Sequence, residues 1–194
     1  MSNVNNVNSA KSGYAASTEQ VKLVASDGAA SDLFGCSAVI SADGAYAVIG
    51  ASYDDVGANT NQGSAYIFAR SGTSWTQQAK LVAGDGAAGD SFGYSVSISA
   101  DGAYAVIGAY NDDIGANDGQ GSAYIFVRSG ASWTQQTKLV ASDGAAYDLF
   151  GQSVSISADG AYAAIGIVAD DVGANSAQGS AYIFVRSGTS WTQQ

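Results

Sequence analysis

Short runs in which apolar and polar residues alternate fill most of the chain. The run YSVSIS at 94–99 alternates with a period of two, which is typical of a β-strand. It leads into Ala-Asp-Gly at 100–102, a tight-turn sequence in which glycine can supply a positive φ. A second apolar run, AYAVIGA, follows at 103–109. Together these segments predict a β-hairpin.

Two more strands are predicted downstream. After a Gly-, Asp- and Asn-rich loop at 111–121 comes SAYIFVR at 122–128, and WTQQTKLV at 133–140 follows a Ser-Gly turn. No segment keeps a 3.6-residue period, so no helix longer than one turn is expected. In the third strand Tyr124 and Phe126 alternate with other apolar residues. Both faces are therefore apolar, as in a sheet sandwiched between two others.

The whole pattern recurs every 58 residues, which indicates an array of repeated units. The period is marked by Trp75, Trp133 and Trp191 and by Lys22, Lys80 and Lys138. The copies are 22–79, 80–137 and 138–194. Four short antiparallel strands per copy are the plan of a β-propeller blade. We therefore predict an all-β fold of three tandem four-stranded blades in one domain at 19–194, after a polar, flexible leader at 1–18.

The charge and the composition of the chain argue against several functions. With 17 Asp and Glu against 7 Lys and Arg, the net charge of −10 repels phosphate backbones, so nucleic acid is not an expected partner. No window approaches the roughly 18 apolar residues that a membrane span needs, and no signal peptide is recognisable. The chain has no histidine, which removes the usual general base and the Ser-His-Asp arrangement. No enzymatic activity, catalytic residue or cofactor is expected.

Two recurring dipeptides resemble those of a known family. Phe-Gly opens the first strand of each copy, at Phe34, Phe92 and Phe150, and Gly-Ala closes the second strand at Gly50 and Gly108. This combination resembles the FG-GAP repeat, the blade of integrin-α-like propellers and of many bacterial surface proteins. The resemblance implies a propeller, usually seven-bladed, that binds other molecules without catalysis in an extracellular or cell-surface protein.

The sequence departs from that family at two points. The third letter of GAP is Ser52, Tyr110 or Val168 and never proline, and the third copy has Gly166-Ile167 in place of Gly-Ala. Family members often hold calcium in an acidic turn between the first two strands. Here only the last acid of that turn remains, at Asp43, Asp101 and Asp159, with serines such as Ser97 and Ser99 at the earlier places. Since Ca²⁺ needs six to eight oxygen ligands, no metal site is expected there.

Other acidic residues recur in the loops. They are Asp27, Asp32, Asp54, Asp55, Asp85, Asp90, Asp112, Asp113, Asp143, Asp148, Asp170 and Asp171. Oxygen-rich loops of this kind could bind Ca²⁺. The alternative, which we favour, is that these residues cap turns through their own backbone, because their spacing matches no known calcium loop.

Three blades are too few to close a ring, since propellers contain about four to eight. Residues 18–25 (TEQVKLVA) match a fourth strand without a blade before it, and the chain ends at WTQQ inside the equivalent strand. This arrangement allows closure by strand exchange between subunits, for example two chains making six blades. We therefore expect further copies of the chain as partners, or a fragment of a longer array, rather than a self-sufficient monomer.

The second and third copies differ at 12 of 57 aligned positions, and ten of these lie in windows 84–94 and 109–119 or their equivalents. In an antiparallel pair the start of the first strand and the end of the second share one edge, which we call the rim. The variation fits either a diversified binding face on a rigid frame or drift in tolerant loops. The candidate ligand-binding residues are Leu33, Cys36, Ser52, Tyr53, Tyr94, Tyr110, Asn111, Tyr147, Leu149 and Gln152.

The sequence thus favours a non-enzymatic binding or adhesion module whose rim takes a protein or glycan ligand. The alternative is a structural protein that assembles into rings or filaments through its blades. The single cysteine, Cys36, aligns with Tyr94 and Gln152, so its position does not require sulfur.

Overall fold

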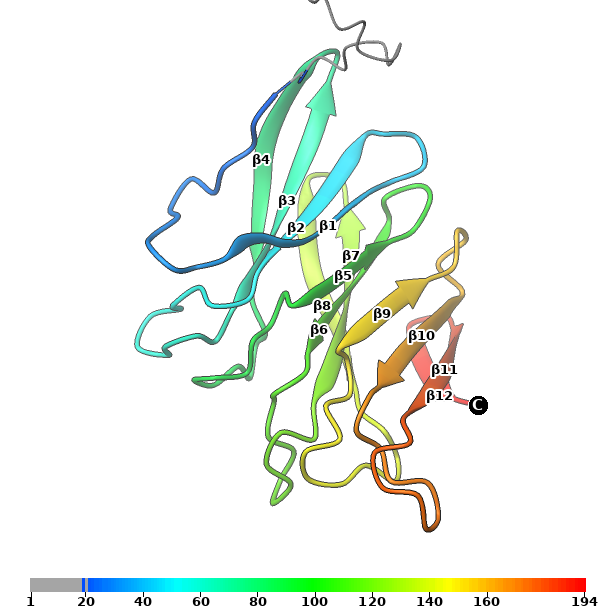
Figure 1. The fold of residues 1–194 in the computed structure, drawn as a ribbon. Helices are drawn as coiled ribbons and strands as arrows, with labels where there is room; N and C mark the ends of the chain where they lie inside the picture. Colours follow the sequence, from blue (N-terminus) through cyan, green and yellow to red (C-terminus); the bar gives the residue numbers. More distant parts are fainter. Residues whose placement is uncertain (1–18, 20) are drawn as a thin grey trace, which may run out of the picture.

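A computed structural model describes residue 19 and residues 21–194, and these contain strands but no helix (Figure 1). The predicted leader at 1–18 lies outside the described residues. Within them, no segment forms the long apolar helix that crossing a membrane requires. The strands are β1 (Phe34–Ile40), β2 (Tyr46–Ala51), β3 (Ser64–Ser71), β4 (Ser74–Leu81), β5 (Ser95–Ile98), β6 (Tyr104–Ala109), β7 (Ser122–Ser129), β8 (Ser132–Leu139), β9 (Ser153–Ile156), β10 (Tyr162–Ile167), β11 (Ser180–Ser187) and β12 (Ser190–Gln193).

The strands form three antiparallel sheets of four, and strands that are consecutive in the chain are neighbours in each sheet. We call β1–β4 blade 1, β5–β8 blade 2 and β9–β12 blade 3. The blades follow one another along the molecule and do not close into a ring (Figure 1). The prediction of three four-stranded repeats is confirmed, and in blade 2 each strand begins and ends within one residue of its predicted bounds.

The Ala-Asp-Gly turn is fixed by its own side chains. The Ser99 hydroxyl donates to the Asp101 carboxylate (2.7 Å) and accepts from the backbone N–H of Ala103 and Tyr104. Gly102 has a φ of 64°, which favours glycine. The turn is thus a hydrogen-bonded hairpin, and the hydroxyl at 99 serves the backbone.

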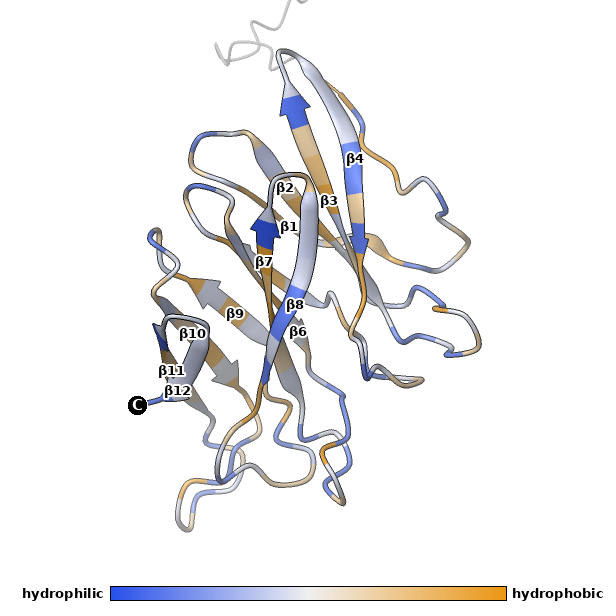
Figure 2. Ribbon diagram, turned by 180° about the vertical axis from the view of Figure 1, so that it is seen from behind, coloured by the Kyte–Doolittle hydropathy of each residue, from blue (hydrophilic) through white to orange (hydrophobic). Residues whose placement is uncertain are grey.

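The hydrophobic core lies between the sheets. One cluster joins Val48 and Ile67 of blade 1 to Phe92, Ile107 and Tyr124, which belong to blade 2 and the loop before it. All five side chains are inaccessible to solvent. Figure 2 shows apolar residues along much of β3 and β7 and hydrophilic residues at their ends. The prediction that both faces of the inner strands are buried is therefore confirmed for blade 2, which lies between the other two blades.

The recurring glycines make this close packing possible. The carbonyl oxygen of Gly93, at the entrance to blade 2, occupies the place that a β-carbon would take on Gly50 of blade 1. The Gly151 carbonyl stands in the same relation to Gly108. The Phe-Gly of one blade and the Gly-Ala of the blade before it are thus two parts of one contact.

The expectation of a spare N-terminal strand is wrong for the described part of that segment. Residues 21–25 pair with no strand. Instead, Leu23 and Ala25 pack against the core residues of blade 1. The physical reason is that a fourth strand needs a neighbouring third strand to bond with, and the described residues contain none before β1.

Candidate functional site

The rim is a continuous edge of the blades, as the sequence predicted. The backbone N–H of Asn111, after β6, donates to the carbonyl of Asp90, in the loop before β5, at 3.3 Å. At the same edge the rings of Tyr94 and Tyr110 lie with their centroids 4.5 Å apart, tilted by 60°. The start of the first strand and the end of the second therefore meet in space.

The predicted rim residues differ in how much of each reaches solvent. Leu33, Cys36, Tyr53, Tyr94, Asn111 and Tyr147 are exposed, and Tyr110, Leu149 and Gln152 are half-buried. Cys36 also has a structural contact, since its thiol donates to the carbonyl of Gly93 at 3.4 Å. Nine of the ten residues can thus be reached by a ligand.

Ser52 is the exception, and its prediction as a contact residue is wrong. Its side chain is 1% exposed. Its equivalents in the other copies are the larger Tyr110, half-buried, and Val168, which is 51% exposed. A small serine fits beneath the rim, whereas these larger side chains extend out of it.

Tyr147 is the most exposed of the large apolar residues of the rim, at 64%. Its φ of 67° lies in the left-handed region, where its equivalent in the second copy is Gly89. A non-glycine residue in this conformation costs about 1–2 kcal/mol. Its backbone N–H donates to the carbonyl of Asp118 at 2.8 Å, which holds the strained position. The loop therefore presents an aromatic ring at a conformational cost.

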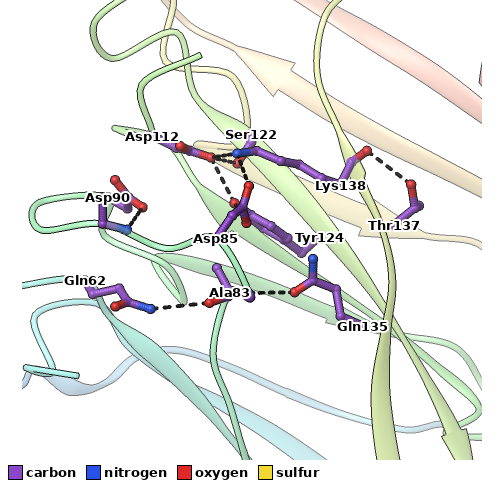
Figure 3. A network of polar contacts seen from close by, with 12 residues as sticks. Gln62, Ala83, Asp85, Asp90, Asp112, Ser122, Tyr124, Gln135, Thr137 and Lys138 are labelled. Carbon is purple, nitrogen blue, oxygen red and sulfur yellow. Dashed lines mark hydrogen bonds and ion pairs between the residues drawn. The ribbon is translucent and has the colours of Figure 1, made fainter. Parts of the chain in front are cut away.

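Sequence reasoning missed a partly buried polar cluster in the blades (Figure 3). In blade 2 the Lys138 ammonium lies 2.8 Å from the Asp85 carboxylate and 2.7 Å from that of Asp112. The Tyr124 hydroxyl, which has one proton to donate, lies 3.0 Å from each of the same two carboxylates. Blade 1 repeats the arrangement with Lys80, Asp27, Asp54 and Tyr66. The signal available was the 58-residue recurrence of lysine, tyrosine and both aspartates.

Charges in this cluster stabilise one another. Burial alone would raise the pKa of Asp85, but the hydrogen bonds from Lys138 and Tyr124 outweigh it and hold the pKa below its usual value. Burial likewise opposes the charge on Lys138, yet its bonds to Asp112 and Asp85 raise its pKa. The lysine ammonium thus occupies the position between the carboxylates that a bound cation would need.

The remaining loop acids hold turns. Asp90 accepts from the backbone N–H of Ala87 at 2.6 Å, and Asp113 accepts from that of Gly119 at 2.7 Å. Both bonds have equivalents in the other blades. Burial, with the nearby charges of Asp112 and Asp113, raises the pKa of Asp90 to about 6. Across residue 19 and residues 21–194, no three acidic, histidine or cysteine side chains group as a metal site.

Two shallow hollows open at the rim. One, about 230 Å³, is lined by Asp27, Asp54 and Lys80 together with Tyr53. The other, about 370 Å³, has Asp143, Asp170 and Tyr147 in its lining and no lysine. The second hollow is therefore the more acidic, and it lies beside the exposed tyrosine.

Two solved structures are similar to the chain at the level of the fold. A crystal structure of Saccharomyces cerevisiae Sqt1 is 13% identical, with a TM-score of 0.51 over 84% of this chain and 35% of that chain. Kuenenia stuttgartiensis hydrazine synthase is 11% identical, with a TM-score of 0.51 over 89% and 38%. The chain thus spans little more than a third of the proteins it matches. A search of curated proteins found no match.

The sequence also matches the FG-GAP repeat three times, at 17–68, 75–126 and 133–184. The second and third matches each begin in the fourth strand of one blade and continue into the third strand of the next. Each unit of the family thus spans a junction between two blades, where the Phe-Gly and Gly-Ala dipeptides meet. Because the three matches cover most of its length, the chain belongs to the FG-GAP repeat family.

Proposed function

We propose that the chain is a non-enzymatic binding module of an extracellular or cell-surface protein, whose rim takes a protein or glycan ligand. The observation that carries the proposal is the contact at the rim between Tyr94, which is exposed, and Tyr110, which is half-buried. Aromatic side chains dominate binding hot spots because they offer large, rigid contact areas. The stability of the fold does not require these two rings to lie at the surface.

Variation between the copies supports the rim as the binding face. Tyr94 becomes Gln152 and Tyr110 becomes Val168 in blade 3, while Tyr147 replaces Gly89. The hairpin at the opposite end keeps the same Ser-Asp hydrogen bond in all three blades. Each blade thus offers a different surface on a common frame, which is how loops on rigid scaffolds carry specificity.

Two observations favour binding over catalysis. FG-GAP propeller repeats are generally non-enzymatic. In addition, Lys80, Lys138 and most of the recurrent aspartates form ion pairs or hold turns within the described residues. The ion-paired cluster therefore serves the fold, and the rim also exposes tyrosines such as Tyr53, Tyr94 and Tyr147.

The proposal is tested with the fluorescently labelled chain on an array of glycans and an array of extracellular-matrix proteins. A ligand found there is then titrated against Tyr110→Ser and Tyr147→Ser. We expect each to weaken binding at least tenfold, whereas Tyr110→Phe and Tyr147→Phe, which keep the rings, retain most of it. Unchanged affinity in both serine variants, with folding intact by circular dichroism, contradicts the proposal.

A further inference from the structure

Each contact between blades joins two different faces. We call the face that a blade turns toward the preceding blade its leading face, and the opposite one its trailing face. Between blades 1 and 2, the trailing residues Val48 and Ile67 meet the leading residues Phe92 and Ile107. Between blades 2 and 3, Val106 and Ile125 meet Phe150 and Ile165 in the same way. One interface is therefore built twice.

The leading face of blade 1 has no blade against it. Ile40 is 59% exposed, although its equivalents Ile98 and Ile156 are 7% and 8% exposed in the two interfaces. Phe34 is half-buried, whereas Phe92 and Phe150 are inaccessible. Only Leu23 and Ala25 from the preceding segment contribute to this cluster.

The trailing face of blade 3 is uncovered in the complementary way. Ile183 is 42% exposed, while its equivalents Ile67 and Ile125 are inaccessible. Tyr162 is 48% exposed. Its equivalents Tyr46 and Tyr104 are each covered by an arginine of the next blade, at 4.4 Å for Arg128 and 4.5 Å for Arg186; the arginine of blade 1, Arg70, has no such ring beside it among the described residues.

The contact between the Phe-Gly and Gly-Ala dipeptides is likewise not made at these two faces. The β-carbon position of Gly50 and that of Gly108 are each filled by a carbonyl of the next blade. At Gly166 the three nearest atoms all belong to Ser153 in the same blade. At the other end, Gly35 has no neighbouring atoms around its β-carbon position. Blade 3 thus has an unoccupied Gly-Ala position, and blade 1 has an unused Phe-Gly.

The outer strand of blade 3 also differs from that of blade 2 in its strand pairing and its ion pairs. In blade 2, Tyr124 lies opposite Lys138. In blade 3, β12 pairs with β11 from Phe184 to Ser187, and among the described residues this pairing does not extend to Tyr182. Tyr182 still donates to Asp143 at 2.8 Å, and no lysine joins them among the described residues.

Lys22 can supply the lysine that this cluster of blade 3 lacks among the described residues. It stands one period of 58 before Lys80, and it is exposed, while the ion pairs between described residues involve only Lys80 and Lys138. If a second chain continues the period beyond blade 3, its residue 22 takes the place opposite Tyr182, since 22 + 3 × 58 = 196 = 138 + 58. Its ammonium then meets Asp143 and Asp170.

We propose that the leading face of blade 1 of a second copy docks on the trailing face of blade 3. Residues 21–23 of that copy extend β12, its Lys22 completes the Asp143–Asp170 cluster, and its Arg70 covers Tyr162. The occupant is a copy of this chain because the two open faces are the two halves of an interface that the chain already builds twice. Two chains place six blades in succession, within the four to eight of known propellers.

The test uses the 194-residue chain in sedimentation velocity. A leading-face variant, Lys22→Asp with Ile40→Lys, and a trailing-face variant, Tyr162→Ser with Ile183→Lys, change only exposed residues, so both should fold. The wild-type chain should sediment above one chain mass of 19.4 kDa, and each variant alone as one chain. Mixed together, the variants retain one intact face each and should form a pair of twice that mass.

The control variant Thr189→Lys adds one positive charge, as the trailing-face variant does, but at the exposed tip of blade 3, and it should associate like the wild type. A wild-type chain that stays monomeric at every concentration overturns the proposal, and this includes the case in which only a further blade of a longer protein fits the face. Variants that associate as strongly as the wild type, or a mixture that stays monomeric, overturn it as well. Ligand binding at the rim is measured separately and does not depend on either result.

Discussion

The carbonyl oxygen of Gly93 stands where a β-carbon on residue 50 would be, so the junction between blades 1 and 2 tolerates only glycine at position 50. The same relation joins Gly151 to Gly108. This contact explains why the Phe-Gly and Gly-Ala dipeptides recur together. It also allows a comparison of two equivalent glycines, because the contribution of Gly108 to stability can be measured against that of Gly166, which faces no carbonyl of another blade.

Gly108→Ala should lower the free energy of unfolding by about 1–3 kcal/mol, because overpacking forces the neighbouring backbone to move. Gly166→Ala is the matched control, since both β-carbons meet a serine hydroxyl of their own blade but only that of residue 108 meets a carbonyl. Urea unfolding measures both substitutions in the trailing-face variant, Tyr162→Ser with Ile183→Lys, which is expected to be monomeric. Equal losses for the two variants contradict the role assigned to the carbonyl.

Lys138→Met should destabilise the chain by roughly 3 kcal/mol, because it leaves the buried Asp112 carboxylate without its cation. Lys138→Arg keeps a cation and should lose much less. Chemical denaturation at neutral pH checks both variants. A loss below 1 kcal/mol for the methionine variant means that water or the Tyr124 hydroxyl already satisfies the carboxylate.

Asp90 should make stability fall as the pH rises from about 4 to about 6. Its pKa is about 6 in the folded chain and 3.8 in the reference state, so in this window the folded state keeps a proton that the unfolded state has lost. Asp90→Asn can still accept the Ala87 N–H and removes this dependence. Its melting temperature relative to wild type should therefore rise between pH 4 and pH 7, and a constant difference contradicts the assignment.

Tyr147→Gly should stabilise the fold by up to about 1 kcal/mol while weakening binding at the rim, because glycine relieves the left-handed backbone and removes the ring. Thermal unfolding and ligand titration measure the two effects on the same sample. Glycine also makes the unfolded chain more flexible, which offsets part of the gain. A variant that loses both stability and binding shows that the ring packs for structure rather than for a ligand.

Much of the fold could be predicted from the sequence, because the strands show residue patterns typical of β-strands and the turns between them contain glycine. The apolar positions on both faces of the third strand, such as Tyr124 and Ile125, predicted that the sheets stack. Residues 21–25 were assigned wrongly, because a strand depends on a partner and their apolar pattern does not reveal whether one is present. The apolar residues of this segment nevertheless indicated a packing contact, since Leu23 packs on blade 1.

The rim was predictable in position and less so in detail. Antiparallel pairing placed Tyr94 beside Tyr110, as found. The burial of Ser52 could not be predicted from the periodicity, because its equivalents Tyr110 and Val168 are half-buried and exposed. The Lys138–Asp85 pair joins residues 53 positions apart in the chain, so only the three-dimensional register brings it together.

The central claim is that one repeated interface continues from chain to chain. Its most direct test is zero-length carbodiimide cross-linking of an equal mixture of ¹⁴N- and ¹⁵N-labelled chains. The account predicts cross-linked peptides that join Lys22 to Asp143 or Asp170 and that combine one light with one heavy partner. Mass spectrometry that finds Lys22 linked only within chains of a single isotope, or not linked to these two aspartates, would contradict it.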